Sequence, residues 1–71
     1  MQTEFYKILG NNIKQRRKEL KITQQELADI AGISLNFVGK IEVAFSKPSL
    51  DTLIDIADAL ETTVSKLTEF C

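Results

Sequence analysis

Histidine is absent from this chain of 71 residues, and cysteine occurs once, at position 71. The chain therefore lacks the side chain that proteins use most often as a general base and as a metal ligand. No cluster of other residues with metal-ligand spacing replaces it, and the few glycines form no phosphate-binding loop. A single cysteine also excludes an internal disulfide framework. We predict neither an enzyme nor a bound metal or cofactor.

Long apolar runs are also missing, because no stretch approaches the roughly 20 residues of a membrane span. The first ten residues, MQTEFYKILG, lack the basic start, apolar stretch and cleavage pattern of a signal peptide. We therefore expect a cytoplasmic protein that does not enter a membrane. A chain of this length forms one domain, residues 1–71. Since such a domain buries only about 60–65% of its unfolded surface, a dimer would add useful apolar burial.

An excess of charge of either sign is missing too, with nine basic and ten acidic residues giving a net charge of −1. This near-neutrality argues against an indiscriminate nucleic-acid binder. Residues 1–48 hold eight basic and five acidic side chains, whereas residues 49–71 hold one basic and five acidic ones. The first part can therefore face phosphate while the second faces away, although scattered surface charges can also divide in this way without a functional reason.

The segment 23–42, TQQELADIAGISLNFVGKIE, has the pattern of two short helices joined by a tight turn. Thr23, with Glu26 three residues later, has the spacing of a capping box. Gly32 can adopt the left-handed conformation that ends a helix, and Ser34 can cap the helix that follows. Such a helix-turn-helix can place its second helix in the major groove of DNA.

Apolar residues at helical spacing predict three further helices. The five helices together cover about residues 4–20, 24–31, 35–43, 50–60 and 64–70. Ser49 and Thr63 are expected to cap the last two, and Gly10 weakens the first, so that its first turns fray or start separately. The inward face of the fourth helix is predicted to comprise Leu50, Leu53, Ile54, Ala57 and Leu60. No segment alternates like a strand, and we expect an all-α domain around one core.

Four segments occur in an order that is specific to one family. They are IKQRRKELKITQQELA at 13–28, GIS at 32–34, VGKIE at 38–42 and PSLDTLIDIADAL at 48–60. With them the chain resembles the Cro/repressor-type helix-turn-helix regulators, also called the XRE family, over about residues 9–67. The resemblance implies the compact five-helix bundle of phage-repressor DNA-binding domains, and members of this family usually bind operator DNA as dimers.

The resemblance also implies roles for single residues. Gln24 matches a family glutamine that begins the first motif helix and holds a DNA phosphate. Arg17 and Glu42 match a pair that forms a partly buried salt bridge in many members. The outward positions of the recognition helix are matched by Ser34, Leu35, Asn36, Phe37 and Lys40.

Helical geometry independently supports the outward orientation of these residues, because a helix that turns Val38 and Ile41 toward the core turns the others away from it. Asn36 is the best candidate base reader, since its carboxamide can pair with N6 and N7 of adenine. Lys40 can contact guanine or a phosphate, and Leu35 can meet a thymine methyl group. The alternative for all three residues is an ordinary solvated helix face. For Leu35 this alternative and DNA contact are equally favoured.

DNA backbone contacts are predicted from Gln24, Ser34, Phe37, Arg16 and Lys47. A helix N-terminus offers free N–H groups to phosphate, which favours this role for Gln24. Phe37 can instead be partly buried in the domain, and exposed basic residues such as Arg16 and Lys47 are often only solvated. Gly39 lowers helix stability, and a close approach to the groove would explain it.

The tripeptide Val43-Ala44-Phe45 departs from the family pattern, which has a basic residue, a glycine and polar or basic residues here. Without the glycine C-cap the third helix is expected to run longer, and without the charge the loop loses phosphate contacts. Phe45 would then fill the core or a dimer contact. The same two alternatives, core or dimer interface, are open for four residues: Phe45, Val64, Leu67 and Phe70.

We predict a sequence-specific transcription regulator, a repressor, that binds a near-palindromic operator in double-stranded DNA as a homodimer through the helix at 35–43. Two such helices would meet half-sites about 34 Å apart. The alternative is a protein–protein interaction module or an antitoxin-like protein with the same fold, which the pI of about 5.3 and Leu35 favour. Salt distinguishes the two, because binding through phosphates weakens steeply as salt is added.

Overall fold

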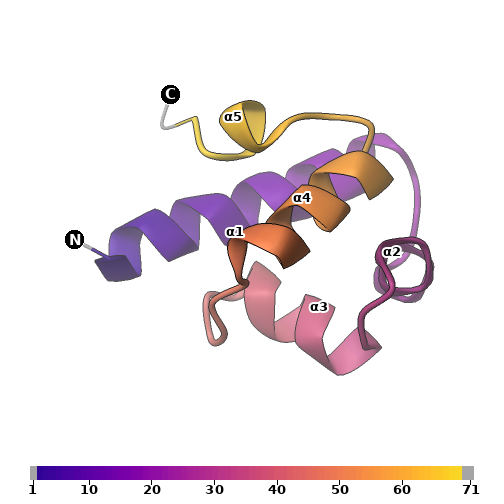
Figure 1. Ribbon diagram of the computed structural model, residues 1–71, viewed down its shortest axis with the longest axis horizontal. Helices are drawn as coiled ribbons and strands as arrows, with labels where there is room; N and C mark the ends of the chain where they lie inside the picture. The colour runs from indigo at the N-terminus through magenta and orange to yellow at the C-terminus, as the bar shows by residue number, and fades with distance from the viewer. Residues whose placement is uncertain (1, 70–71) are drawn as a thin grey trace.

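Five α-helices make up the computed structural model, which describes residues 2–69 (Figure 1). They are α1 (Gln2–Glu19), α2 (Gln24–Ala31), α3 (Leu35–Glu42), α4 (Leu50–Ala59) and α5 (Val64–Leu67). Residues 2–69 contain no strand, and the predicted all-α fold class is confirmed.

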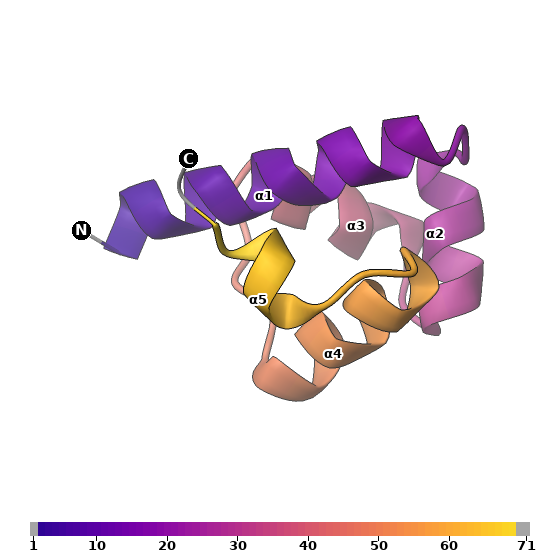
Figure 2. The ribbon, with the colours of Figure 1, turned by 90° about the horizontal axis from the view of Figure 1, so that it is seen from above.

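The long helix α1 runs along the molecule, and the other four helices are folded against one another beside it (Figures 1 and 2). Helix α3 packs against both α1 and α2, whereas α4 packs against α2, and α5 bridges α4 and α1. In Figure 1, α3 lies at the lower edge and α5 at the upper edge of the molecule. The outer side of α3 therefore faces away from α5.

The helix starts agree with the local sequence signals. Thr23 Oγ1 accepts from the backbone N–H of Glu26 at 3.0 Å, and Glu26 Oε1 accepts from the backbone N–H of Thr23 at 2.8 Å. This reciprocal pair is the predicted capping box. Ser34, Ser49 and Thr63 cap α3, α4 and α5 through their hydroxyl oxygens, as predicted.

Helices α1 to α4 are each followed by a left-handed residue, and only one of these four residues is a glycine. Gly32 has φ of 75°, as predicted for the turn between α2 and α3, but Lys21, Ala44 and Glu61 also have positive φ. After α3, the N–H of Phe45 donates to Lys40 O at 2.8 Å, and the N–H of Ala44 donates to Ile41 O at 3.1 Å. This is a Schellman motif with alanine in the position that favours glycine. The expectation of a longer third helix is therefore wrong, because the hydrogen bonds hold the turn without glycine.

The core is formed by apolar side chains from all five helices and from the residue that follows α4. Its buried members are Leu9, Ile13, Leu27, Ala28, Ala31, Val38, Ile41, Leu53, Ile56, Ala57, Leu60 and Leu67. Leu67 is only 2% exposed and is thus a core residue rather than an open dimer contact. One of the four residues divided between core and interface is therefore assigned to the core.

Helix α4 buries only part of its predicted inward face, because Leu53, Ala57 and Leu60 are in the core as predicted but the other two residues are not. Leu50 and Ile54 are 65% and 43% exposed, while Ile56 is buried beside Leu53 and Ala57. The prediction for Leu50 and Ile54 is therefore wrong. Since α4 carries apolar residues on more than one side, two overlapping stripes fit the helical period equally well.

Gly10 lies where α1 touches the end of α3. A Cβ atom at this position would overlap the backbone oxygen of Ile41 and would lie 2.7 Å from that of Glu42. The two helices therefore approach backbone to backbone, which a larger residue would prevent. Helix α1 continues through Gly10 without interruption, so the expected fraying or separate start of its first turns is wrong.

Candidate nucleic-acid interface

The outer side of α3 presents four residues in two pairs. Leu35 and Asn36 are exposed in the first turn, and Gly39 and Lys40 are partly exposed one turn later. The hydroxyl of Ser34 accepts from the N–H of Phe37 at 3.0 Å, which fixes the start of this helix. The first turn of α3 is thus uncovered along the side that was predicted to read bases.

The N-terminus of α2 opens beside the middle of α3. Gln24 is the first residue of α2, and its Oε1 atom is the nearest heavy atom to a Cβ built at Gly39, at a distance of 4.0 Å. The free N–H groups of a helix N-terminus attract anions. The side chain at the N-terminus of α2 therefore lies next to the exposed side of α3.

A hollow of about 340 Å³ lies on this surface. It is lined by Gln24, Leu35, Asn36, Gly39, Lys40, Val43 and Phe45. Val43 is 72% exposed and continues the outer side of α3 beyond Gly39. Sequence reasoning missed Val43, although its position eight residues after Leu35 places it on the same side of a continuing helix.

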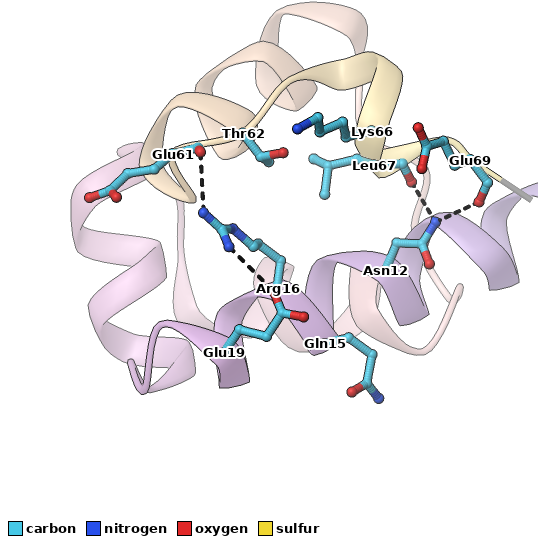
Figure 3. A pocket seen from close by; sticks show the side chains of 9 residues that line it. All are labelled: Asn12, Gln15, Arg16, Glu19, Glu61, Thr62, Lys66, Leu67 and Glu69. Carbon is cyan, nitrogen blue, oxygen red and sulfur yellow. Dashed lines mark hydrogen bonds and ion pairs between the residues drawn. The ribbon is translucent and has the colours of Figure 1, made fainter. Parts of the chain in front are cut away.

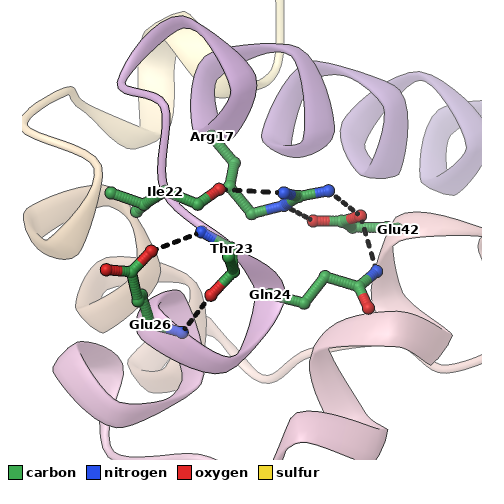
Figure 4. Close-up of polar contacts among 6 residues, drawn as sticks. All are labelled: Arg17, Ile22, Thr23, Gln24, Glu26 and Glu42. Atoms are coloured by element: carbon green, nitrogen blue, oxygen red, sulfur yellow. Dashed lines mark hydrogen bonds and ion pairs between the residues drawn. The ribbon is translucent and has the colours of Figure 1, made fainter.

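A buried ionic network joins α1, α2 and α3 behind this surface (Figure 4). Arg17 Nε donates to Glu42 Oε2 at 2.7 Å and Arg17 Nη2 donates to Glu42 Oε1 at 3.2 Å, so the expected ion pair is present and bidentate. Arg17 Nη1 donates to Ile22 O at 3.0 Å, and Gln24 Nε2 donates to Glu42 Oε1 at 3.0 Å. The side chain of Glu42 is 2% exposed, and its charge is met by three donated hydrogen bonds.

Comparison with known proteins agrees with this geometry. The family model described as Helix-turn-helix (HTH_3) matches residues 13–67, which is most of the chain. This chain belongs to that family. It is a transcription regulator of the helix-turn-helix type, and the resemblance to the XRE family is confirmed.

Two curated relatives and one solved structure are examples of proteins that are similar to this chain. The control protein C.SmaI of Serratia marcescens is 36% identical over 64 residues, which cover 90% of this chain and 76% of that protein. The immunity repressor protein of Bacillus phage phi105 is 42% identical over 59 residues, which cover 83% of this chain and 41% of that protein. The solution structure of the DNA-binding domain of the P22 C2 repressor superposes with a TM-score of 0.81 at 30% identity, covering 83% of this chain and 78% of that one. The regulator therefore spans most of the control protein but less than half of the phage repressor.

Arg16 does not lie with the interface of the regulator (Figure 3). Its Nε donates to Leu60 O at 2.9 Å and its Nη2 to Glu61 O at 3.3 Å, while Nη1 pairs with Glu19 at 3.3 Å. These contacts satisfy the carbonyl groups at the end of α4. We therefore correct the expected phosphate contact of Arg16 to a capping role.

A second residue of α1 has a structural role that the sequence did not reveal. Asn12 Nδ2 donates to Leu67 O at 2.8 Å and to Glu69 O at 3.0 Å, which ties the C-terminal segment to α1. Arg16 and Asn12 line the same cavity of about 350 Å³ between α1 and α5 (Figure 3). Both contacts join residues far apart in sequence, so no local pattern indicates them.

The loop after α3 carries the regulator's most exposed large apolar side chain within residues 3–69. Phe45 is 76% exposed, so the core alternative for this residue is wrong. Its ring lies 5.7 Å from Lys40 Nζ, close enough for a cation–π contact. Lys47 Nζ lies in the same way 5.3 Å from the ring of Tyr6. Both loop residues are therefore held against neighbouring elements.

The remaining candidates are less exposed. Phe37 and Val64 are partly buried and pack against the core cluster. The partial burial predicted as one alternative for Phe37 is therefore present, while contact of its exposed part with DNA stays a prediction. Phe70 lies outside the described residues.

Residues 2–69 include no helix long and apolar enough to cross a membrane. They also include no group of three side chains with the chemistry and spacing of a metal site.

Proposed function

We propose that the regulator is a repressor that binds a near-palindromic operator as a homodimer, with α3 of each subunit in the major groove. The single observation that supports this most is the uncovered outer side of α3, where exposed Asn36 lies beside the N-terminus of α2. A carboxamide on the first turn of such a helix is well placed to read adenine. Lys40, one turn later, contacts guanine or the adjacent phosphate.

Three residues would hold the DNA backbone around α3. Gln24 Nε2 carries two hydrogens, and its bond to Glu42 uses one of them, so the other is available to a phosphate oxygen. The hydroxyl of Ser34 accepts from a backbone N–H and still has its own hydrogen to donate. Lys47 adds a positive charge on the loop that follows α3. These contacts position the helix, while the exposed side of α3 provides specificity.

The homodimer is proposed from symmetry and from surface chemistry. Two copies related by a two-fold axis would place their α3 helices in half-sites about 34 Å apart. Helix α5 lies on the side of the molecule opposite α3 (Figure 1), and its residue Val64, which is partly exposed, remains a candidate contact. A dimer formed there would leave both recognition surfaces free.

Selection of bound sequences from random duplex DNA, followed by salt titration, tests this function. We expect an enriched near-palindrome whose binding constant falls steeply with salt. Lys40→Ala should weaken binding, and if Lys40 meets a phosphate the salt slope should fall by about one. Lys18→Ala is the matched control, since Lys18 is an exposed lysine of α1 that does not line the hollow on α3. Recovery of no enriched sequence would contradict the function and favour a protein-interaction module.

A further inference from the structure

The outer side of α3 has an interrupted apolar stripe. Leu35, Gly39 and Val43 follow at intervals of four residues, so two large apolar side chains flank a position without a side chain. Leu35 is 44% and Val43 72% exposed, which leaves both free to touch a ligand. The hollow described above is lined by Gly39 together with these two side chains.

The fold does not explain the glycine at position 39. Gly39 has no positive φ, and a Cβ built there would meet only Gln24 Oε1, at 4.0 Å, which is ordinary contact. A glycine inside a helix lowers stability relative to alanine. At Gly10, in contrast, the backbone of α3 leaves no room for a Cβ. Gly39 is therefore an open position that packing leaves free for a side chain.

Phe45 also lines the hollow. The Schellman turn at Ala44 brings the chain back toward α3, and the Phe45 ring lies 5.7 Å from Lys40 Nζ. The cation–π contact thus joins two of the residues that line the hollow. The result is a recess with apolar walls from Leu35, Val43 and Phe45, and with Asn36 and Lys40 as polar neighbours.

The major groove of DNA offers one apolar group at a base edge, the C5-methyl group of thymine. We propose that the hollow over Gly39 receives this methyl group, so that Gly39, Val43 and Phe45 select a thymine in each operator half-site. The inference rests on the proposed function, because it requires α3 to enter the groove. It assigns Phe45 to DNA contact instead of to the core or to a dimer interface.

Replacement of single thymines by deoxyuridine tests the inference directly, because it removes only the methyl group. The operator found by selection is synthesised with each thymine replaced in turn, and its binding to the full chain is measured by fluorescence anisotropy. We expect about a fourfold weaker affinity at one thymine of each half-site, as for the loss of one buried methyl group. At the other thymines the uracil-to-thymine ratio, which is the dissociation constant with deoxyuridine divided by that with thymidine, should be near one.

Three variants connect that ratio with the hollow. Gly39→Ala places a methyl group in it, and Phe45→Ala removes one of its lining side chains. Both should bring the uracil-to-thymine ratio toward one. Gly39→Ala should fold, because its Cβ makes only an ordinary contact with Gln24 Oε1 at 4.0 Å, and thermal denaturation checks this. Ile30→Ala is the matched control, since Ile30 is a 61% exposed apolar residue of α2 that does not line the hollow, and its ratio should equal that of the wild type.

The outcomes separate this inference from the function on which it rests. An enriched operator with a ratio near one at every thymine would overturn the methyl recess and leave the DNA-binding function standing. A wild-type ratio in Gly39→Ala would also overturn it, as would a Phe45→Ala variant that keeps the ratio and loses self-association in sedimentation. Failure to enrich any sequence would overturn both.

Discussion

Gly10 lies on α1, where that helix contacts the inner side of α3, whereas Gly39 lies on the outer side of α3. The absence of a side chain has a different consequence at each position. At Gly10 the absence of a side chain lets α1 touch the backbone of α3. At Gly39 it leaves a hollow on the exposed side of α3, where a methyl group would fit. Packing thus restricts which residues can stand where α1 meets the inner side of α3, whereas on the outer side packing sets no such limit and a ligand can set it.

The largest effect on the inner side is expected from Arg17→Ala. This change leaves Glu42, whose side chain is 2% exposed, without the bidentate donor to its charge. Removing one partner of such a buried pair costs about 3–5 kcal/mol, so the domain should unfold or lose much of its stability. Urea denaturation followed by circular dichroism measures the change. An unchanged unfolding midpoint would mean that the network does not hold α1 to α3.

A smaller but still clear loss is expected from Gly10→Ala. The added Cβ would overlap the backbone oxygen of Ile41, and backbone cannot move aside as a flexible side chain can. Overpacking of this kind costs about 1–3 kcal/mol. Gly39→Ala is the matched change on the outer side and should keep or raise the melting temperature. Equal losses of stability in the two variants would remove the distinction between the two sides.

Ala44→Gly should stabilise the protein by roughly 1 kcal/mol, which is the smallest of these effects. Ala44 has φ of 63°, where a Cβ is unfavourable and glycine is not. The gain is reduced by the greater freedom of glycine in the unfolded chain. Calorimetry of the two proteins compares their stabilities. A lower melting temperature in the variant would show that the turn after α3 does not carry the expected strain.

Local signals in the sequence predicted the fold well because the helix starts depend on near neighbours. Thr23 with Glu26, Ser34, Ser49 and Thr63 each act within three residues of their own position. The ends were harder, because the turn at Ala44 is held by backbone hydrogen bonds that do not require glycine. A pattern based on residue type could not find it.

Long-range packing could not be read from the sequence. Arg16 looked like a free basic residue, and only the approach of α4 to α1 reveals its bond to Leu60 O. Leu50 fitted an inward stripe, and only the orientation of α4 shows that Ile56 is buried instead. The residues of the candidate interface were found because helical period and the family resemblance both placed them outside. Val43 was missed, and the recess depends on it.

Binding of Asn36→Ala to the selected operator tests most directly whether the exposed side of α3 reads bases. Asn36 is exposed, so the variant should keep the melting temperature of the wild type. We expect it to lose about 1–3 kcal/mol of discrimination at one base pair in each half-site, while binding elsewhere in the site is read as before. A variant that binds the same operator with unchanged affinity and unchanged preference at every position would contradict the account.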